Sequence, residues 1–162
     1  MNRNEIDSIA KEKAEKAESF FRSGYGCAQA VLLAFKEETG LDEKTLIKLG
    51  APFGGGIGRM RQVCGAALGA FMLSGLLKSE GNRAEDYARV RDIAAKYTEE
   101  NGSVVCAELL KGVKVTEGTA PEARDEGYYK RRPCPKLCAS AAEIAAHVLL
   151  TSCQKSDELG EK

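Results

Sequence analysis

The chain has 162 residues, of which 43% are hydrophobic, and this length and composition suit one compact domain with its own core. Its 24 Lys and Arg residues balance its 24 Asp and Glu residues, so it lacks the positive field that draws proteins to nucleic acid or anionic membranes. The charged N-terminus has no apolar signal core, and no run approaches the roughly 18 apolar residues of a membrane span. We therefore expect a cytoplasmic protein that binds neither nucleic acid nor a membrane.

The first half of the chain shows the apolar period of helices. Residues 3–22 form an amphipathic pattern that only Lys13 interrupts, and residues 25–38 repeat it. Residues 41–50 predict a short helix that is capped by Asp42. Residues 61–77 are apolar on every side, which predicts a central helix that is packed all round.

The second half continues the helical pattern. A helix that begins at an Asn82 cap is expected to bury one stripe of side chains: Tyr87, Val90, Ala94 and Tyr97. Residues 103–112 predict a short helical turn, and residues 134–152 predict the last helix. No segment alternates as a strand does, and no repeat or linker divides the chain. The expected fold is all-α, a single domain over residues 1–162 with about seven helices around the central apolar helix.

The six cysteines require an explanation, because cytosolic thiols are kept reduced and structural disulfides are rare there. No Cys-x-x-Cys pair is present, so neither a zinc ribbon nor a thioredoxin motif is indicated. Helix starts stabilise thiolates through unpaired N–H groups and the helix dipole, and they lower the pKa of cysteine. Four cysteines lie at or near predicted helix starts: Cys27, Cys64, Cys106 and Cys134, the last as an N-cap before Pro135.

Residues 53–64 combine four glycines within five positions, two arginines and a cysteine. Glycines let a ligand approach the backbone closely. The arginines either neutralise or bind an anionic group, or lie on the surface as ordinary charges, and both readings stay open. The missing Gly-Lys-Ser/Thr ending excludes a Walker phosphate loop. The candidate cofactor-binding residues are Gly54, Gly55, Gly56, Gly58, Arg59 and Arg61.

The remaining polar segments are weaker candidates. Residues 113–133 form a polar stretch that is long for a compact domain, and we expect it to cover a site. The basic run at residues 130–132 is expected to be solvated. His147 lies roughly 20 Å along the last helix from Cys134, which argues against a Cys-His hydrolase.

The cysteines belong to longer motifs. The motifs are Gly24-Tyr25-Gly26-Cys27-Ala28-Gln29-Ala30-Val31, residues 53–60, Cys64-Gly65-Ala66-Ala67-Leu68-Gly69, Cys106-Ala107-Glu108-Leu109-Leu110 and Cys134-Pro135-Lys136. Over about residues 18–150, their order and spacing resemble the bacterial and archaeal family of redox-active proteins labelled C_GCAxxG_C_C. The resemblance implies redox or metal chemistry at the four cysteines named above. Gly26 departs from the pattern, because similar sequences usually carry Asn there.

Three hypotheses stay open. In the first, Cys27, Cys64, Cys106 and Cys134 come together beside residues 54–58 and 115–132. There they hold an iron–sulfur cluster or another thiolate-bound metal and carry electrons for a redox protein partner. In the second, Cys64 has a low pKa and attacks in thiol–disulfide exchange, and another of these four cysteines, such as Cys27, resolves the product. The third is a helical adaptor whose thiols bind structural zinc or pack.

The two other cysteines are assigned smaller roles. Cys138 is expected in the core, with the role of an auxiliary ligand or resolving thiol left open, and Cys153 is expected to be incidental. Self-association as a homo-oligomer also stays open.

Overall fold

The computed structural model describes the backbone of residues 1–158 and the side chains of residues 1–151. Within this range the all-α prediction is confirmed, because the described residues form helices, turns and one isolated bridge but no strand. The helices are α1 (Arg3–Arg22), α2 (Cys27–Ala34), α3 (Lys36–Thr39), α4 (Glu43–Gly50), α5 (Gly65–Lys78), α6 (Arg83–Asn101), α7 (Cys106–Leu109), α8 (Glu126–Arg131) and α9 (Cys134–Glu158).

The described residues form nine α-helices rather than about seven, and both additions have local causes. Phe35 leaves helical geometry at φ −111° and ψ 23°, so the expected helix over residues 25–38 is split into α2 and α3. The other addition, α8, lies inside the predicted polar stretch. It begins where the Asp125 side chain accepts a hydrogen bond from the Tyr128 N–H at 2.8 Å.

Helix α1 shows why a lysine interrupts its apolar stripe. Lys13 is almost fully buried, and its ammonium group lies 2.5 Å from a carboxylate oxygen of Glu38. The same ammonium group lies 5.2 Å from the centroid of the Phe35 ring. The buried charge is therefore paired, and Lys13 ties α1 to the end of α2 and to α3.

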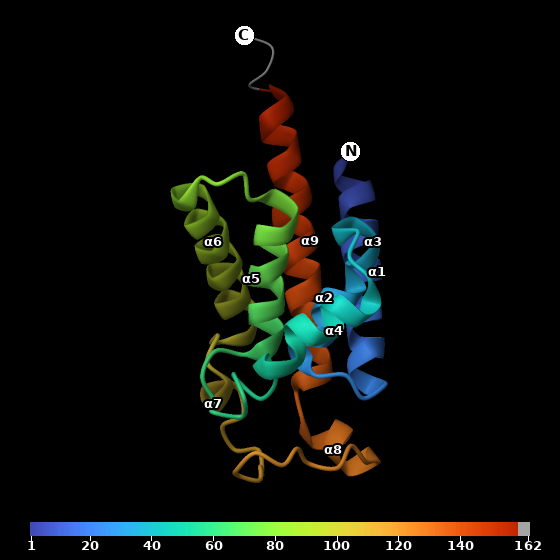
Figure 1. Cartoon of the computed structure of the whole chain (residues 1–162), viewed down its shortest axis with the longest axis vertical. Coiled ribbons are helices and arrows are strands. Elements are labelled where there is room, and N and C mark those ends of the chain that lie inside the picture. The colour runs from blue at the N-terminus through green and yellow to red at the C-terminus, as the bar shows by residue number, and fades with distance from the viewer. Residues whose placement is uncertain (159–162) are drawn as a thin grey trace.

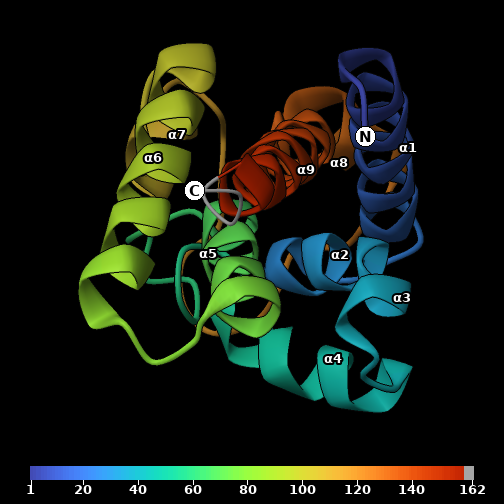
Figure 2. The same cartoon turned by 90° about the horizontal axis from the view of Figure 1, so that it is seen from above.

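The longest helix, α9, runs through the middle of the bundle and packs against α1, α2, α5 and α6 (Figure 2). Helix α5 contacts α2, α6 and α9, so the predicted apolar helix shares the centre with α9. Gly69 allows the close approach of α5 and α2, because a Cβ atom there would lie 2.9 Å from Cβ of Val31.

Helix α6 buries fewer residues than its pattern predicts. Ile93 and Tyr97 are fully buried, but the Tyr87 side chain is 62% exposed, so the prediction for Tyr87 is wrong. The reason is that α6 lies at the side of the bundle and packs mainly on α5 and α9, which leaves its first turns facing solvent (Figure 2).

Several loops and short helices gather at one end of the bundle, opposite the start of α1 and the end of α9 (Figure 1). They comprise the loop between α4 and α5, the short helices α7 and α8, and a strap that we define as residues 113–125. No helix among the described residues has the length and apolar character needed to cross a bilayer.

Candidate functional site: a cavity lined by four cysteines

Four cysteines mark the starts of four different helices. Cys27, Cys106 and Cys134 are the first residues of α2, α7 and α9, and Cys64 is the N-cap of α5. The predicted N-cap role of Cys134 is wrong by one position, because the Pro133 carbonyl accepts the Leu137 N–H at 3.0 Å. All four cysteines line one cavity of about 520 Å³. The structure therefore brings together residues that lie more than a hundred positions apart in sequence.

Backbone pairing holds the starts of α5 and α7 side by side. Val63 and Val105 form an isolated antiparallel bridge. The Cys64 N–H donates to the Val104 carbonyl at 2.7 Å, and the Cys106 N–H donates to the Gln62 carbonyl at 2.6 Å. Two of the four cysteines are thus positioned by direct main-chain hydrogen bonds between distant segments.

The glycine-rich loop lies directly against Cys106. Gly54, Gly55, Gly56 and Gly58 all line the cavity. Gly56 has φ 72°, and a Cβ atom there would lie 2.6 Å from Cβ of Cys106 and 2.8 Å from the Gln62 nitrogen. Only glycine combines this left-handed conformation with this close approach.

Three residues of the same loop that are not glycine have a left-handed backbone conformation. Ile57, Arg59 and Arg61 have φ values of 64°, 62° and 58°. Such conformations cost roughly 1–2 kcal/mol for a residue with a Cβ atom. This strained turn places both arginines at the cavity wall.

At the start of α5, Gly65 allows Cys27 to approach. A Cβ atom at Gly65 would lie 2.6 Å from the Phe53 carbonyl oxygen and 3.1 Å from Cβ of Cys27. The glycine that follows Cys64 therefore has a packing reason: it lets the starts of α2 and α5 meet at the cavity.

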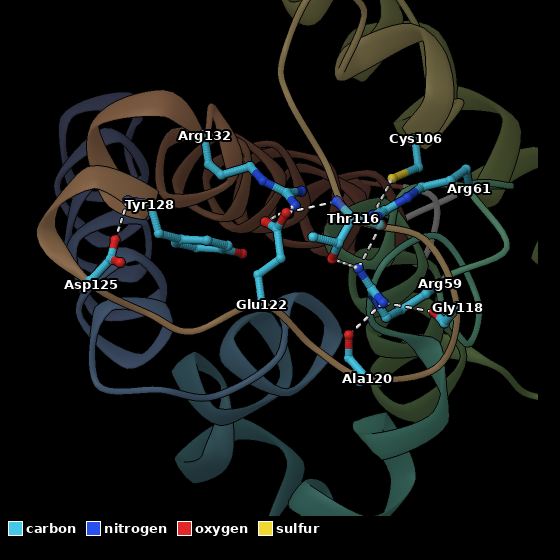
Figure 3. Close-up of polar contacts among 10 residues, drawn as sticks. All are labelled: Arg59, Arg61, Cys106, Thr116, Gly118, Ala120, Glu122, Asp125, Tyr128 and Arg132. Carbon is cyan, nitrogen blue, oxygen red and sulfur yellow. Dashed lines mark hydrogen bonds and ion pairs between the residues drawn. The ribbon is translucent and has the colours of Figure 1, made fainter.

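The two arginines of the loop share one partner, the Thr116 carbonyl, and differ in the others (Figure 3). The Arg59 guanidinium donates to the carbonyls of Gly118 at 2.6 Å, Ala120 at 2.5 Å and Thr116 at 2.8 Å. The Arg61 guanidinium lies 4.0 Å from Sγ of Cys106 and donates to the Thr116 carbonyl at 3.3 Å. Arg59 thus holds the strap over the cavity, whereas Arg61 places positive charge beside a thiol.

We expect Arg59→Ala to loosen the strap, because it removes the hydrogen bonds to three strap carbonyls. Hydrogen–deuterium exchange of the amides of residues 114–120 should become about tenfold faster, as the loss of one charge-assisted hydrogen bond of about 1.5 kcal/mol would produce. The exposed strap residue Lys114 provides a control, since Lys114→Ala should leave exchange unchanged. Equal exchange in both variants would show that Arg59 does not secure the strap.

The cavity also contains a buried ion pair that sequence reasoning missed. Arg132 donates to a carboxylate oxygen of Glu122, and the two side chains are only 5% and 9% exposed. The Arg132 guanidinium lies 5.0 Å from the centroid of the Tyr128 ring (Figure 3). The expectation of a solvated basic run is therefore wrong for Arg132, although Lys130 and Arg131 are exposed. The strap has no period from which this pairing could be predicted.

A further arginine joins the strap to the helices. Arg124 lines the cavity and donates to the carbonyls of Phe21 at 2.8 Å and Tyr25 at 3.1 Å. Its guanidinium lies 4.0 Å from the centroid of the Phe21 ring. Arg59 thus secures the middle of the strap, and Arg124 secures its C-terminal end.

The thiols of the cavity are hard to ionise in this fold. Burial raises the pKa of Cys64, although Tyr97 and the N–H groups of Ala67 and Ala66 lower it. Burial also raises the pKa of Cys106, against the opposite effect of Arg61. The contact with Cys27 and burial raise the pKa of Cys134. The predicted low pKa of Cys64 is therefore wrong, because removal from water disfavours the thiolate more than the helix start favours it.

Cys138 and the histidine are not among the residues that line the cavity. Cys138 is fully buried, and its Sγ lies 3.9 Å from the Cys27 carbonyl oxygen and contacts the Cys27 thiol. The side chain of Cys153 lies outside the described residues. His147 pairs with Asp7 of α1 at 3.7 Å and does not line the cavity.

The fold and the site together define the class of protein. Its described residues form an all-helical fold, and four of its cysteines converge on one cavity from separate helix starts. A family model described as "Putative redox-active protein (C_GCAxxG_C_C)" matches residues 25–148, and the chain belongs to this family. The resemblance seen in the sequence is therefore confirmed. No match was found among curated proteins or solved structures.

Proposed function

We propose that Cys27, Cys64, Cys106 and Cys134 hold an iron–sulfur cluster, through which the protein exchanges electrons with a redox protein partner. The observation that supports this proposal is the convergence of four thiols, from four helix starts, on one cavity. When bound, a cluster would supply a one-electron carrier.

The donor set suits a soft metal centre. Four thiols line the cavity, no histidine does, and its one carboxylate, Glu122, is paired with Arg132. Among the described side chains, no group of three His, Cys, Asp or Glu residues is placed to hold a single metal ion. The ligands of an iron–sulfur cluster bind separate metal atoms, so four thiols that line one cavity suit a cluster.

The cavity wall can offset the charge of several thiolates. Arg61 lies beside Cys106, and Arg132 lies beside Cys134. Helix N-termini add the positive ends of their dipoles, although burial keeps the thiols protonated in the absence of metal. A bound metal reverses this balance, because a coordinating thiol loses its proton.

We expect opposite pH responses with and without metal. A thiol whose pKa is raised by folding stabilises the metal-free protein at neutral pH, and this stabilisation is lost as the pH rises above roughly 8.5, where thiols of the unfolded chain ionise. Iron retention should instead fall as the pH decreases from about 8 to 5, because protons compete for the sulfurs. Urea unfolding at pH 7 and 9.5 and iron analysis after desalting measure the two effects. In the metal-free state, the free energy of unfolding of Cys64→Ala should fall less between pH 7 and 9.5 than that of the unsubstituted protein. An equal fall in both proteins would contradict the assignment of this pH effect to these thiols.

Anaerobic reconstitution tests the function itself. Protein purified without oxygen and incubated with ferrous iron and sulfide should turn brown, bind iron and sulfide in similar amounts, and show an electron paramagnetic resonance signal in one redox state. Zinc is measured in the same sample. A colourless protein that retains neither iron nor sulfide would refute the cluster.

One contact favours thiol–disulfide exchange as the second candidate. The Cys27 and Cys134 thiols both line the cavity and lie close enough that each affects the pKa of the other, and Cys27 is the partly exposed member of the cavity set. Here Cys27 and Cys134 would form a disulfide and release two electrons and two protons, which reduce a disulfide of a partner protein to two thiols. A colourless protein in which this one pair oxidises reversibly would support the exchange reaction instead.

A further inference from the structure

We infer that Tyr97 is a positioning residue for the cysteine site: its hydroxyl donates a hydrogen bond to the Cys64 sulfur and raises the reduction potential of the centre that Cys64 helps to hold. The inference rests on the proposed function for its electrochemical part. A second measurement, on metal-free protein, tests the hydrogen bond independently.

The contact is direct and buried. The Tyr97 hydroxyl oxygen lies 3.3 Å from Sγ of Cys64, Tyr97 is fully buried, and Cys64 is 5% exposed. A tyrosine hydroxyl has a proton to donate, whereas a metal-bound thiolate can only accept, so with a metal bound at Cys64 the hydroxyl would be the donor.

The backbone at Tyr97 is anchored to the central helix. The side-chain amide of Asn101 donates to the Tyr97 carbonyl at 3.1 Å and to the Ser140 hydroxyl of α9 at 2.9 Å. One helical turn before Tyr97, the buried face of α6 carries the apolar residue Ile93. A phenylalanine would fill the same space as Tyr97, so the hydroxyl is the group that the packing of α6 does not explain.

The Tyr97 hydroxyl gives the Cys64 sulfur a polar neighbour, as the arginines do for two other cysteines of the site. Arg61 lies beside Cys106 and Arg132 lies beside Cys134, whereas the polar side chain that meets the Cys64 sulfur is Tyr97. In a buried site of low dielectric, a hydrogen bond to sulfur is strong and favours the more negative, reduced form of a centre. If the site holds such a centre, the centre would take up the electron, while Tyr97 would only donate the hydrogen bond and would keep its proton.

The test compares Tyr97→Phe with Tyr87→Phe, which alters an exposed tyrosine of the same helix. Iron-loaded Tyr97→Phe should bind as much iron as the unsubstituted protein but have a more negative midpoint potential. The expected shift is about three- to tenfold in the oxidised-to-reduced ratio, which is roughly 30–60 mV for a one-electron couple. Tyr87→Phe should leave the potential unchanged.

The metal-free measurement is the rate of alkylation of each cysteine by iodoacetamide, followed by mass spectrometry. Tyr97→Phe should slow alkylation of Cys64 about three- to tenfold and leave Cys106 unchanged, because the thiolate of Cys64 loses its donor. If the unsubstituted protein holds no iron, the proposed cluster fails and this rate still tests the hydrogen bond. An unchanged Cys64 rate together with an unchanged potential overturns the inference. So does a Tyr97→Phe protein whose only defect is a lower unfolding temperature, since that would make Tyr97 a packing residue.

Discussion

Replacing any one of Cys27, Cys64, Cys106 and Cys134 by alanine is expected to lower the iron content of reconstituted protein more than about tenfold. The reason is that a cluster needs all of its thiolate ligands, and even residues that only orient a ligand change metal affinity 10–100-fold. Iron and sulfide analysis after anaerobic desalting measures the loss, and the visible absorption should fall with it.

Cys138 provides the matched control for these variants. It is buried next to Cys27 but does not line the cavity. Cys138→Ala should therefore retain iron while losing a small amount of stability from the missing sulfur. The opposite result would be that two of the four cysteine variants lose all redox cycling, the other two change it little, and no variant binds iron. That result would exclude the cluster and favour a disulfide pair.

Gly56→Ala is the backbone substitution expected to have the largest effect on the site. Its Cβ atom would lie 2.6 Å from Cβ of Cys106, and the residue would keep φ near 72°. Overpacking and left-handed strain together should destabilise the protein by about 2–4 kcal/mol and displace Cys106. Urea unfolding gives the stability, and iron content after reconstitution reports the position of Cys106.

Gly58→Ala separates strain from overlap. Gly58 has φ 55°, but the nearest atom to its added Cβ would be the Pro52 carbonyl oxygen at 3.9 Å. This variant should lose only about 1 kcal/mol and keep its iron. If both variants bind iron as well as the unsubstituted protein, the close contact between Gly56 and Cys106 has no role in forming the site.

The helices were predictable because their signals are local. The apolar period and the caps at Asp42 and Asn82 involve residues only a few positions apart, and the structure places both side chains as N-caps. The placement of four cysteines at helix starts was also predictable from neighbouring glycines, serines and prolines. The same local reasoning failed where burial decided the result: Tyr87 has the right period but no helix packs over it.

Other properties depend on distances that no local pattern contains. The sequence by itself determined that the chain is helical and that Cys27, Cys64, Cys106 and Cys134 begin or border helices. Only the tertiary structure decided that these helix starts meet at one cavity, that Arg132 is buried there, and that Tyr97 reaches the Cys64 sulfur. It also decided the direction of the Cys64 pKa, since the loss of hydration depends on everything packed around the sulfur, whereas the helix-start effect depends only on the next few residues.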